Sequence, residues 1–150
     1  MSKIEFNRRR AAVIPDLRPM YKIAKILMIL ALCCSGKKAS LLKLHLLNWA
    51  LLDSQRFKAL KLSAEQKKLL LGVWGIDPSL NMALQFAVSE KLILRLANGS
   101  FQLSDLGLEF MNKSNMIGLL PELSLEMKAL GKGITEKMVN EAVRKWNNEI

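Results

Sequence analysis

The chain is poor in the residues from which most catalytic and metal-binding sites are built. Its 150 residues include a single histidine, His45, and two cysteines, Cys33 and Cys34, which are adjacent. One histidine cannot supply a multi-histidine metal site, and adjacent cysteines have neither the spread of a disulfide framework nor the CxxC spacing of a metal site. We therefore interpret both cysteines as buried thiols in a reducing compartment.

Long apolar runs and phosphate-binding loops are also missing. The longest apolar run has nine residues, 26–34, whereas a membrane-spanning helix needs about 18 or more. The arginines near the start lead into prolines rather than into an apolar segment, so a signal peptide is a poor fit. Gly72 and Gly75 lack the lysine context of a Walker loop. We expect a cytoplasmic protein that holds no cofactor and no metal and contacts no membrane.

The polar residues do not form a recognisable catalytic set. The acidic side chains of the second half are scattered singly. His45 lies between two leucines, where a histidine hydrogen-bonded in or beside the core is the simpler interpretation. A Cys–His nucleophile built from Cys34 and His45 is an alternative that the sequence does not support. We expect that the chain is not an enzyme.

Positive charge is concentrated in the first half. Residues 1–75 hold 15 Lys and Arg against four Asp and Glu, residues 76–150 hold eight against nine, and the net charge is +10. The asymmetry indicates that the first half faces a polyanion or an acidic protein surface, although a solvated face would give the same pattern. The candidate contact residues are Arg8, Arg9, Arg10, Lys37, Lys38, Lys43, Arg56, Lys58, Lys61, Lys67 and Lys68.

Helical signals dominate the front of the chain. Residues 21–34 and 40–53 predict two apolar helices joined by a turn at Gly36, the second capped by Ser40. The second is apolar around most of its circumference, so we expect it to be the buried centre of the domain. A third helix is predicted to start at Ser63, because Gln66 completes a capping box, and to end at the glycines that follow.

The middle of the chain has the order helix, strand, turn, strand, helix. Asp77-Pro78 predicts a helix start. Residues 92–96 and 100–103 predict strands around Asn98-Gly99, a pair typical of type I′ turns with positive φ at both central residues. Ser104 caps the next helix, whose inward residues are expected to be Leu106, Leu108 and Phe110. This order predicts a mainly α, winged-helix-like domain with a two-stranded wing hairpin and additional N- and C-terminal helices.

We expect three parts along the chain. Residues 1–19 form a basic arm that prolines keep from being helical, residues 20–115 form the winged-helix-like core, and residues 116–150 form a C-terminal helical extension. Thr135 is predicted to cap the last helix, whose apolar stripe would dock on the core or on a partner. The expected docking residues are Leu80, Leu84, Val139, Val143 and Trp146.

The helix before the wing is a weak candidate for reading DNA. In a DNA-reading winged helix this element enters the major groove, but residues 78–90 contain no Lys or Arg. The charge elsewhere fits salt-dependent contact with the DNA backbone or docking to an acidic subunit. The alternative is a winged-helix transcription regulator that binds DNA as a dimer through Asn81, Gln85 and Arg95.

Residues 37–51, KKASLLKLHLLNWAL, carry a resemblance to a known family. Together with the preceding YKIAKILMILAL, they resemble the middle component of bacterial ABC-three-component systems. The chain is similar to the small third subunit of Lamassu-type antiphage defence systems, and residues 40–50 are the most specific part. The resemblance implies a non-catalytic accessory subunit that binds an SMC-like ATPase dimer and couples DNA sensing to an effector, usually a nuclease. ATP and metal would then belong to the partners, and double-stranded DNA would be contacted non-specifically within the complex.

Overall fold

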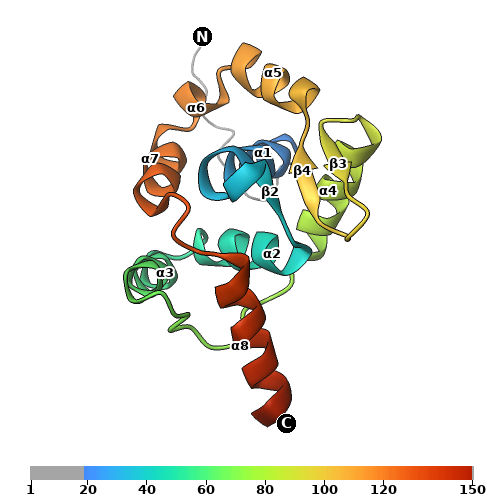
Figure 1. Cartoon of the computed structure of the whole chain (residues 1–150). Helices are drawn as coiled ribbons and strands as arrows, with labels where there is room; N and C mark the ends of the chain where they lie inside the picture. Colours follow the sequence, from blue (N-terminus) through green and yellow to red (C-terminus); the bar gives the residue numbers. More distant parts are fainter. Residues whose placement is uncertain (1–18, 150) are drawn as a thin grey trace.

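The computed structural model describes residues 19–149, which form a mainly helical domain with a small three-stranded antiparallel sheet (Figure 1). The elements in chain order are α1 (Pro19–Cys33), η3 (Ser35–Lys37), β2 (Lys38–Ala39), α2 (Leu41–Ala50), α3 (Ser54–Gln66), α4 (Pro78–Ser89), β3 (Ile93–Arg95), β4 (Phe101–Leu103), α5 (Asp105–Lys113), α6 (Met116–Leu119), α7 (Pro121–Leu130) and α8 (Glu136–Glu149). The proposed basic arm, with Arg8, Arg9 and Arg10, lies outside the described residues.

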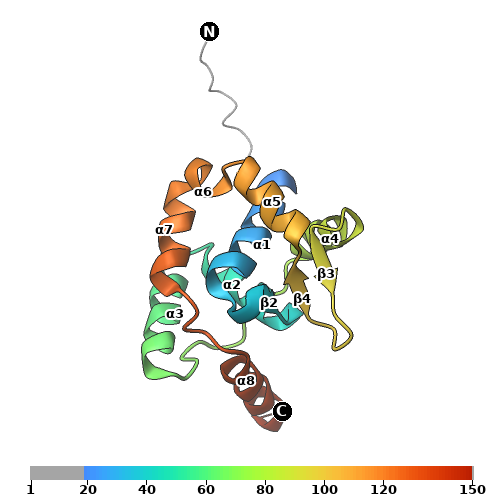
Figure 2. The ribbon, with the colours of Figure 1, turned by 45° about the horizontal axis from the view of Figure 1, so that its top comes forward.

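Helix α1 is the centre of the domain. Figures 1 and 2 show α2, α4, α5 and α7 arranged around it, and it packs against each of them. The prediction of a largely buried helix is confirmed for residues 43–48 and Ala50, but its place at the centre is wrong, because the other helices pack around α1 and α2 already ends at Ala50. Helix α1 can take the central place because its two lysines find polar partners inside the protein. Within residues 19–149 no helix combines the length and the apolar character that crossing a bilayer requires.

Four helices start at the predicted caps. The hydroxyl of Ser40 accepts from the amide of Lys43 at 3.2 Å, and the hydroxyl of Ser104 accepts from the amide of Gly107 at 2.9 Å. The Asp77 carboxylate accepts from the amide of Ser79 at 2.9 Å, with Pro78 as the first helical residue. Thr135 caps α8 through the amide of Met138 at 3.2 Å. These caps are confirmed; each satisfies an amide that the helix itself leaves unpaired.

The third helix lies earlier in the sequence than predicted. It starts after Asp53, which caps it, and Ser63 lies in its last turns rather than before its first. The Ser63 hydroxyl donates to the carbonyl of Ala59 at 2.8 Å and accepts from the amide of Leu70 at 2.9 Å. Ser63 therefore fixes the segment that follows the helix. Helix α3 ends at its C-cap, Lys67, whose backbone is left-handed with φ of 57°. Residues 69–77 then run without regular structure.

The sheet contains one strand more than the predicted hairpin. Strand β4 pairs with β3 on one side and with β2 on the other, giving the order β2-β4-β3. Strand β2 has two residues, which is too short for any alternation to appear in the sequence. The turn at Asn98-Gly99 is confirmed, but only Gly99, with φ of 87°, has the positive φ expected of both. Leu96 pairs with Ser100 across a three-residue loop, which explains the difference.

The C-terminal helices share the core of the rest of the domain. Met127 of α7 and Val139 of α8 are buried in the same cluster as the α1 residues. Helix α5 packs through Gly107 and Met111. The prediction that Leu106 points inward is wrong, since its side chain is 50% exposed; the close approach of Gly107 to Leu92 rotates α5 so that Leu106 faces outward.

Gly107→Ala should lower the free energy of unfolding by about 2 kcal/mol or more, because overpacking forces backbone shifts. A Cβ at this position would overlap the carbonyl oxygen of Leu92 and lie 2.8 Å from Cδ1 of Leu103. Urea denaturation of both proteins measures the change. Gly72→Ala is the control, because a Cβ there meets nothing within 4 Å. Equal stability of the two variants would contradict the packing described for α5.

Candidate functional site

A partly buried polar cluster joins α1, α2 and the start of α4. Its centre is the Asp77 carboxylate, which accepts from the ammonium of Lys22 at 3.0 Å and from the side-chain amide of Asn48 at 3.3 Å. The Asp77 amide donates to Nδ1 of His45 at 3.2 Å. We call Lys22, His45, Asn48, Asp77 and Asn81 the Asp77 cluster. Its hydrogen bonds tie three helices together, so we interpret it as structural.

His45 has the structural role that its position predicts. Because Nδ1 accepts a hydrogen bond, Nε2 carries the proton and donates to Oδ1 of Asn81 at 2.9 Å. Both ring nitrogens are therefore engaged by α4 and its preceding residue, and neither faces a thiol. The structure does not assemble the Cys–His pair.

The two cysteines are free and buried, as predicted. Burial and the neighbouring Cys34 raise the pKa of Cys33 to about 12, and burial raises the pKa of Cys34 to about 11. The Cys33 thiol donates to the carbonyl of Met127 at 3.5 Å. Within residues 19–149, no three His, Cys, Asp or Glu residues come together as a metal site.

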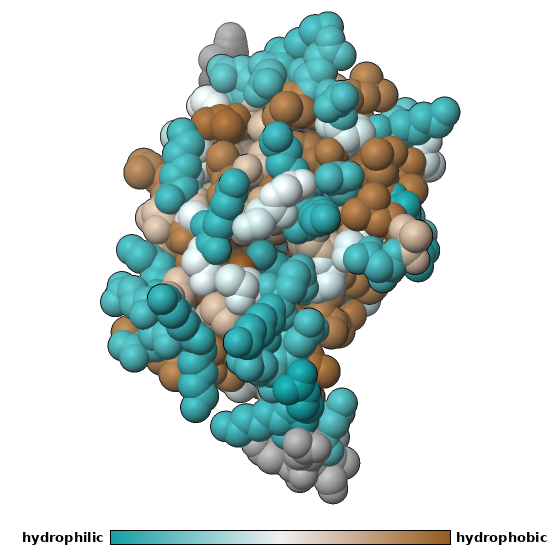
Figure 3. All heavy atoms as spheres, viewed as in Figure 1, coloured by the Kyte–Doolittle hydropathy of each residue, from teal (hydrophilic) through white to brown (hydrophobic). Residues whose placement is uncertain are grey.

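The predicted basic residues divide into an exposed group and a structural group. Lys43 is only 3% exposed, and Arg56 lies on the ring of Trp49, 4.3 Å from its centroid, while donating to the Trp49 carbonyl at 3.2 Å. These two are therefore poorly placed to contact DNA or a partner. The exposed members are Lys37, Lys38, Lys58, Lys61, Lys67 and Lys68. Hydrophilic side chains gather over α3 and α8 (Figure 3).

The predicted docking residues are mostly in the core. Leu80, Leu84 and Val139 are buried and cannot contact a partner in this fold. Val143 and Trp146 are half-buried on α8. The Trp146 ring meets the buried Trp74 edge-on, with 4.4 Å between the ring centroids.

The outer side of α4 exposes apolar side chains that sequence reasoning missed. Met82 is 72% and Phe86 is 51% exposed, one helical turn apart. We call Met82, Gln85, Phe86 and Ser89 the α4 face; all four are exposed. The signal was present in the sequence, because Met82 and Phe86 fall outside the spacing of the buried stripe formed by Leu80, Ala83, Leu84 and Ala87. A cleft of about 440 Å³ runs beside this face, towards Arg95 and Phe101 of the hairpin.

A second cleft, of about 670 Å³, lies between α8 and the segment that follows α3. We call it the α8 cleft. Its polar lining residues are Lys67, Lys68, Glu141 and Lys145, and Trp146 forms part of its apolar wall. It brings two of the predicted basic residues together with one of the predicted docking residues.

Asp77→Asn should destabilise the protein at pH 7 by about 2 kcal/mol, because it removes the negative charge that Lys22 contacts at 3.0 Å. Burial raises the pKa of Asp77, but hydrogen bonds from Ser79 and Lys22 outweigh this and hold the pKa well below its usual range. A pKa lower in the folded than in the unfolded state gives stability above the unfolded value, about 3.9, that is lost as the pH falls. Urea denaturation from pH 7 to pH 2.5 should therefore show the difference between wild type and variant shrinking below about pH 4. A difference independent of pH would contradict the role of the carboxylate charge.

Both thiols should resist alkylation in the folded protein, because the reactive species is the thiolate and burial disfavours it. At pH 8, iodoacetamide should modify neither cysteine in native buffer and both in 6 M guanidinium chloride, as counted by mass spectrometry. Rapid modification of either thiol in native buffer would show that the region around Cys33 and Cys34 opens.

No protein-family model matches the chain, and no curated protein and no solved structure is significantly similar to it.

Proposed function

We propose that the chain is a non-catalytic accessory subunit of an SMC-like ATPase complex in bacterial antiphage defence, where it bridges the ATPase heads, DNA and an effector nuclease. The proposal combines the resemblance of residues 37–51 with the α4 face. The single structural observation that supports it best is this face, which exposes Met82 and Phe86 on a helix without Lys or Arg.

The order of elements is consistent with a winged helix carrying extra helices. Strand β2 follows α1 and pairs with β4, the second strand of the hairpin, and α4 immediately precedes that hairpin. In such a fold α4 occupies the position of the DNA-reading helix. Helix α3 and the helices after α5 are the additions.

The α4 face fits a protein surface better than a DNA groove. Phosphate neutralisation by Lys and Arg supplies most of the affinity for DNA, and residues 78–89 offer neither. Exposed neighbouring Met and Phe side chains are typical of the centre of a protein interface, where burial of apolar area stabilises the complex. We therefore assign the α4 face to the ATPase or the effector.

In this proposal, DNA is contacted by exposed lysines that lie outside α4. Lys37 ends η3 and Lys38 begins β2, whereas Lys58 and Lys61 lie on α3. Lysine contacts of this kind bind the phosphates of the DNA backbone. They do not distinguish between bases, and they weaken as the salt concentration rises. They suit an auxiliary role inside a complex that holds the DNA by other means.

Co-purification of the tagged chain with the products of its neighbouring genes tests the proposal. We expect a stable complex that contains an SMC-like ATPase, and weak, non-specific DNA binding by the chain alone. Met82→Asp combined with Phe86→Asp should weaken the complex at least about tenfold, because central apolar contacts carry most of the binding energy. Leu125→Asp is the matched control, since Leu125 is 69% exposed on α7, away from this face.

Circular dichroism of each variant establishes that the fold is kept. A loss of binding can then be attributed to the substituted surface residues. A lone dimer with tight, sequence-selective DNA binding would overturn the proposal in favour of the transcription regulator. Retention of the ATPase by the double variant would exclude the α4 face as its docking surface.

A further inference from the structure

The α8 cleft has an apolar floor and a cationic rim. Leu69, Leu71, Met138, Ala142 and Trp146 supply the floor. Lys67 and Lys68 stand on one side and Lys145 on the other, against a single carboxylate, that of Glu141. The side chains of all three lysines are exposed. The cleft therefore presents an excess of positive charge around a hydrophobic centre.

Both walls of the cleft are held in place. At the start of α8 the Glu136 carboxylate accepts from the Ser40 amide at 2.9 Å and from the Ser40 hydroxyl at 2.7 Å. Further along, Trp146 packs on Trp74, whose indole donates to the carbonyl of Leu42 at 3.1 Å. The cleft is thus a preformed feature, and its volume of about 670 Å³ lies within the usual range of ligand pockets.

We propose that the α8 cleft binds a short acidic segment of a partner protein. One large apolar side chain of that segment fills the floor beside Trp146, and flanking carboxylates pair with the lysines of the rim. Charge complementarity selects an acidic partner, because three lysines face one glutamate. The apolar floor supplies the affinity, whereas the rim supplies specificity and speeds association.

A nucleic acid fits this cleft less well. A duplex presents phosphates on a rigid cylinder, so the apolar floor would stay hydrated. A single strand could stack a base on Trp146, so an oligonucleotide serves as the competing ligand in the test. The inference does not depend on the accessory-subunit proposal, which uses the α4 face instead.

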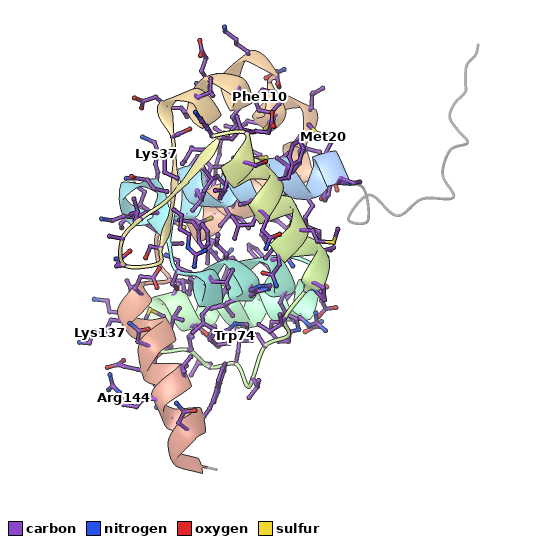
Figure 4. All side chains as sticks on the ribbon, turned by 90° about the vertical axis from the view of Figure 1, so that its right-hand side faces the viewer. Met20, Lys37, Trp74, Phe110, Lys137 and Arg144 are labelled. Atoms are coloured by element: carbon purple, nitrogen blue, oxygen red, sulfur yellow. The ribbon has the colours of Figure 1, made fainter. Side chains whose placement is uncertain are left out.

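Helix α8 offers a matched control for the charge on the rim. Lys145 lines the cleft, whereas Lys137 and Arg144 lie on the side of α8 away from Trp74 (Figure 4). Lys145→Glu and Arg144→Glu thus change the net charge equally at adjacent positions of one helix. Only the first alters the cleft.

Selection of a phage-displayed library of random 12-residue peptides on the full chain tests the proposal. Enriched peptides should carry Asp or Glu around one Trp, Phe or Leu. A synthetic copy of the tightest peptide should bind at least about tenfold more weakly to Lys145→Glu and within about twofold of wild type to Arg144→Glu. Ala142→Trp, which fills the floor without changing charge, should also abolish binding. In NMR spectra the peptide should shift the indole N–H of Trp146.

Three results would overturn the proposal. The first is a selection that enriches no peptide or only peptides without the acidic and apolar pattern. The second is equal loss of binding in Lys145→Glu and Arg144→Glu, which would indicate general electrostatics. The third is tight binding of a dT12 oligonucleotide that depends on Lys145 and Trp146, which would assign the cleft to single-stranded nucleic acid.

Discussion

The Asp77 carboxylate is the contact on which the arrangement of the helices depends. It accepts from Lys22 on α1 and from Asn48 on α2, and it caps α4 through Ser79. A lysine inside an apolar central helix needs a polar or charged partner that compensates for the loss of water, and for Lys22 the Asp77 carboxylate provides one. The same contact fixes where α4 begins, and therefore where the hairpin after α4 lies. Packing of apolar side chains alone would leave the position of α4 along α1 much less well defined.

Residues 40–50 owe their distinctive pattern to the attachments that α2 makes. Ser40 binds Glu136 at the start of α8, and His45 binds the amide of Asp77 and the side chain of Asn81. Trp49 supports Arg56 on α3 and lies under Gly75. Ser40, His45 and Trp49 therefore each contact another part of the same chain. These residues hold the domain together, whereas the α4 face is built from residues outside the motif, among them Met82 and Phe86.

The sequence predicts the features that depend on residues a few positions apart, such as helix caps. It fails for features that depend on contacts between distant segments, such as which helix is central. The caps at Ser40, Asp77, Ser104 and Thr135 follow from hydrogen bonds to amides two or three positions away, and all were predictable. The choice of α1 over α2 as the central helix depends on Lys22 and Lys25 meeting polar groups far along the chain. Ser63 satisfies the rules for starting a helix, yet tertiary packing places it near a helix end. For the candidate surfaces, the helical spacing of α4 already separates the buried Leu80 from the exposed Met82, whereas the burial of Val139 depends on how α8 packs against distant segments.

The distribution of charge along the sequence is a poor guide to its distribution in space. Several basic residues of the first half are buried inside the domain, among them Lys22 beside Asp77, and Lys43. The second half is nearly neutral in sequence, but Glu136 is engaged by Ser40 and Glu109 by Lys113. Helix α8 then places Lys145 opposite Lys67 and Lys68, residues about 80 positions earlier. The cationic surface around the α8 cleft is therefore produced by folding, which brings the ends of both halves together. A partner that recognises this surface recognises the folded domain and not the basic first half alone.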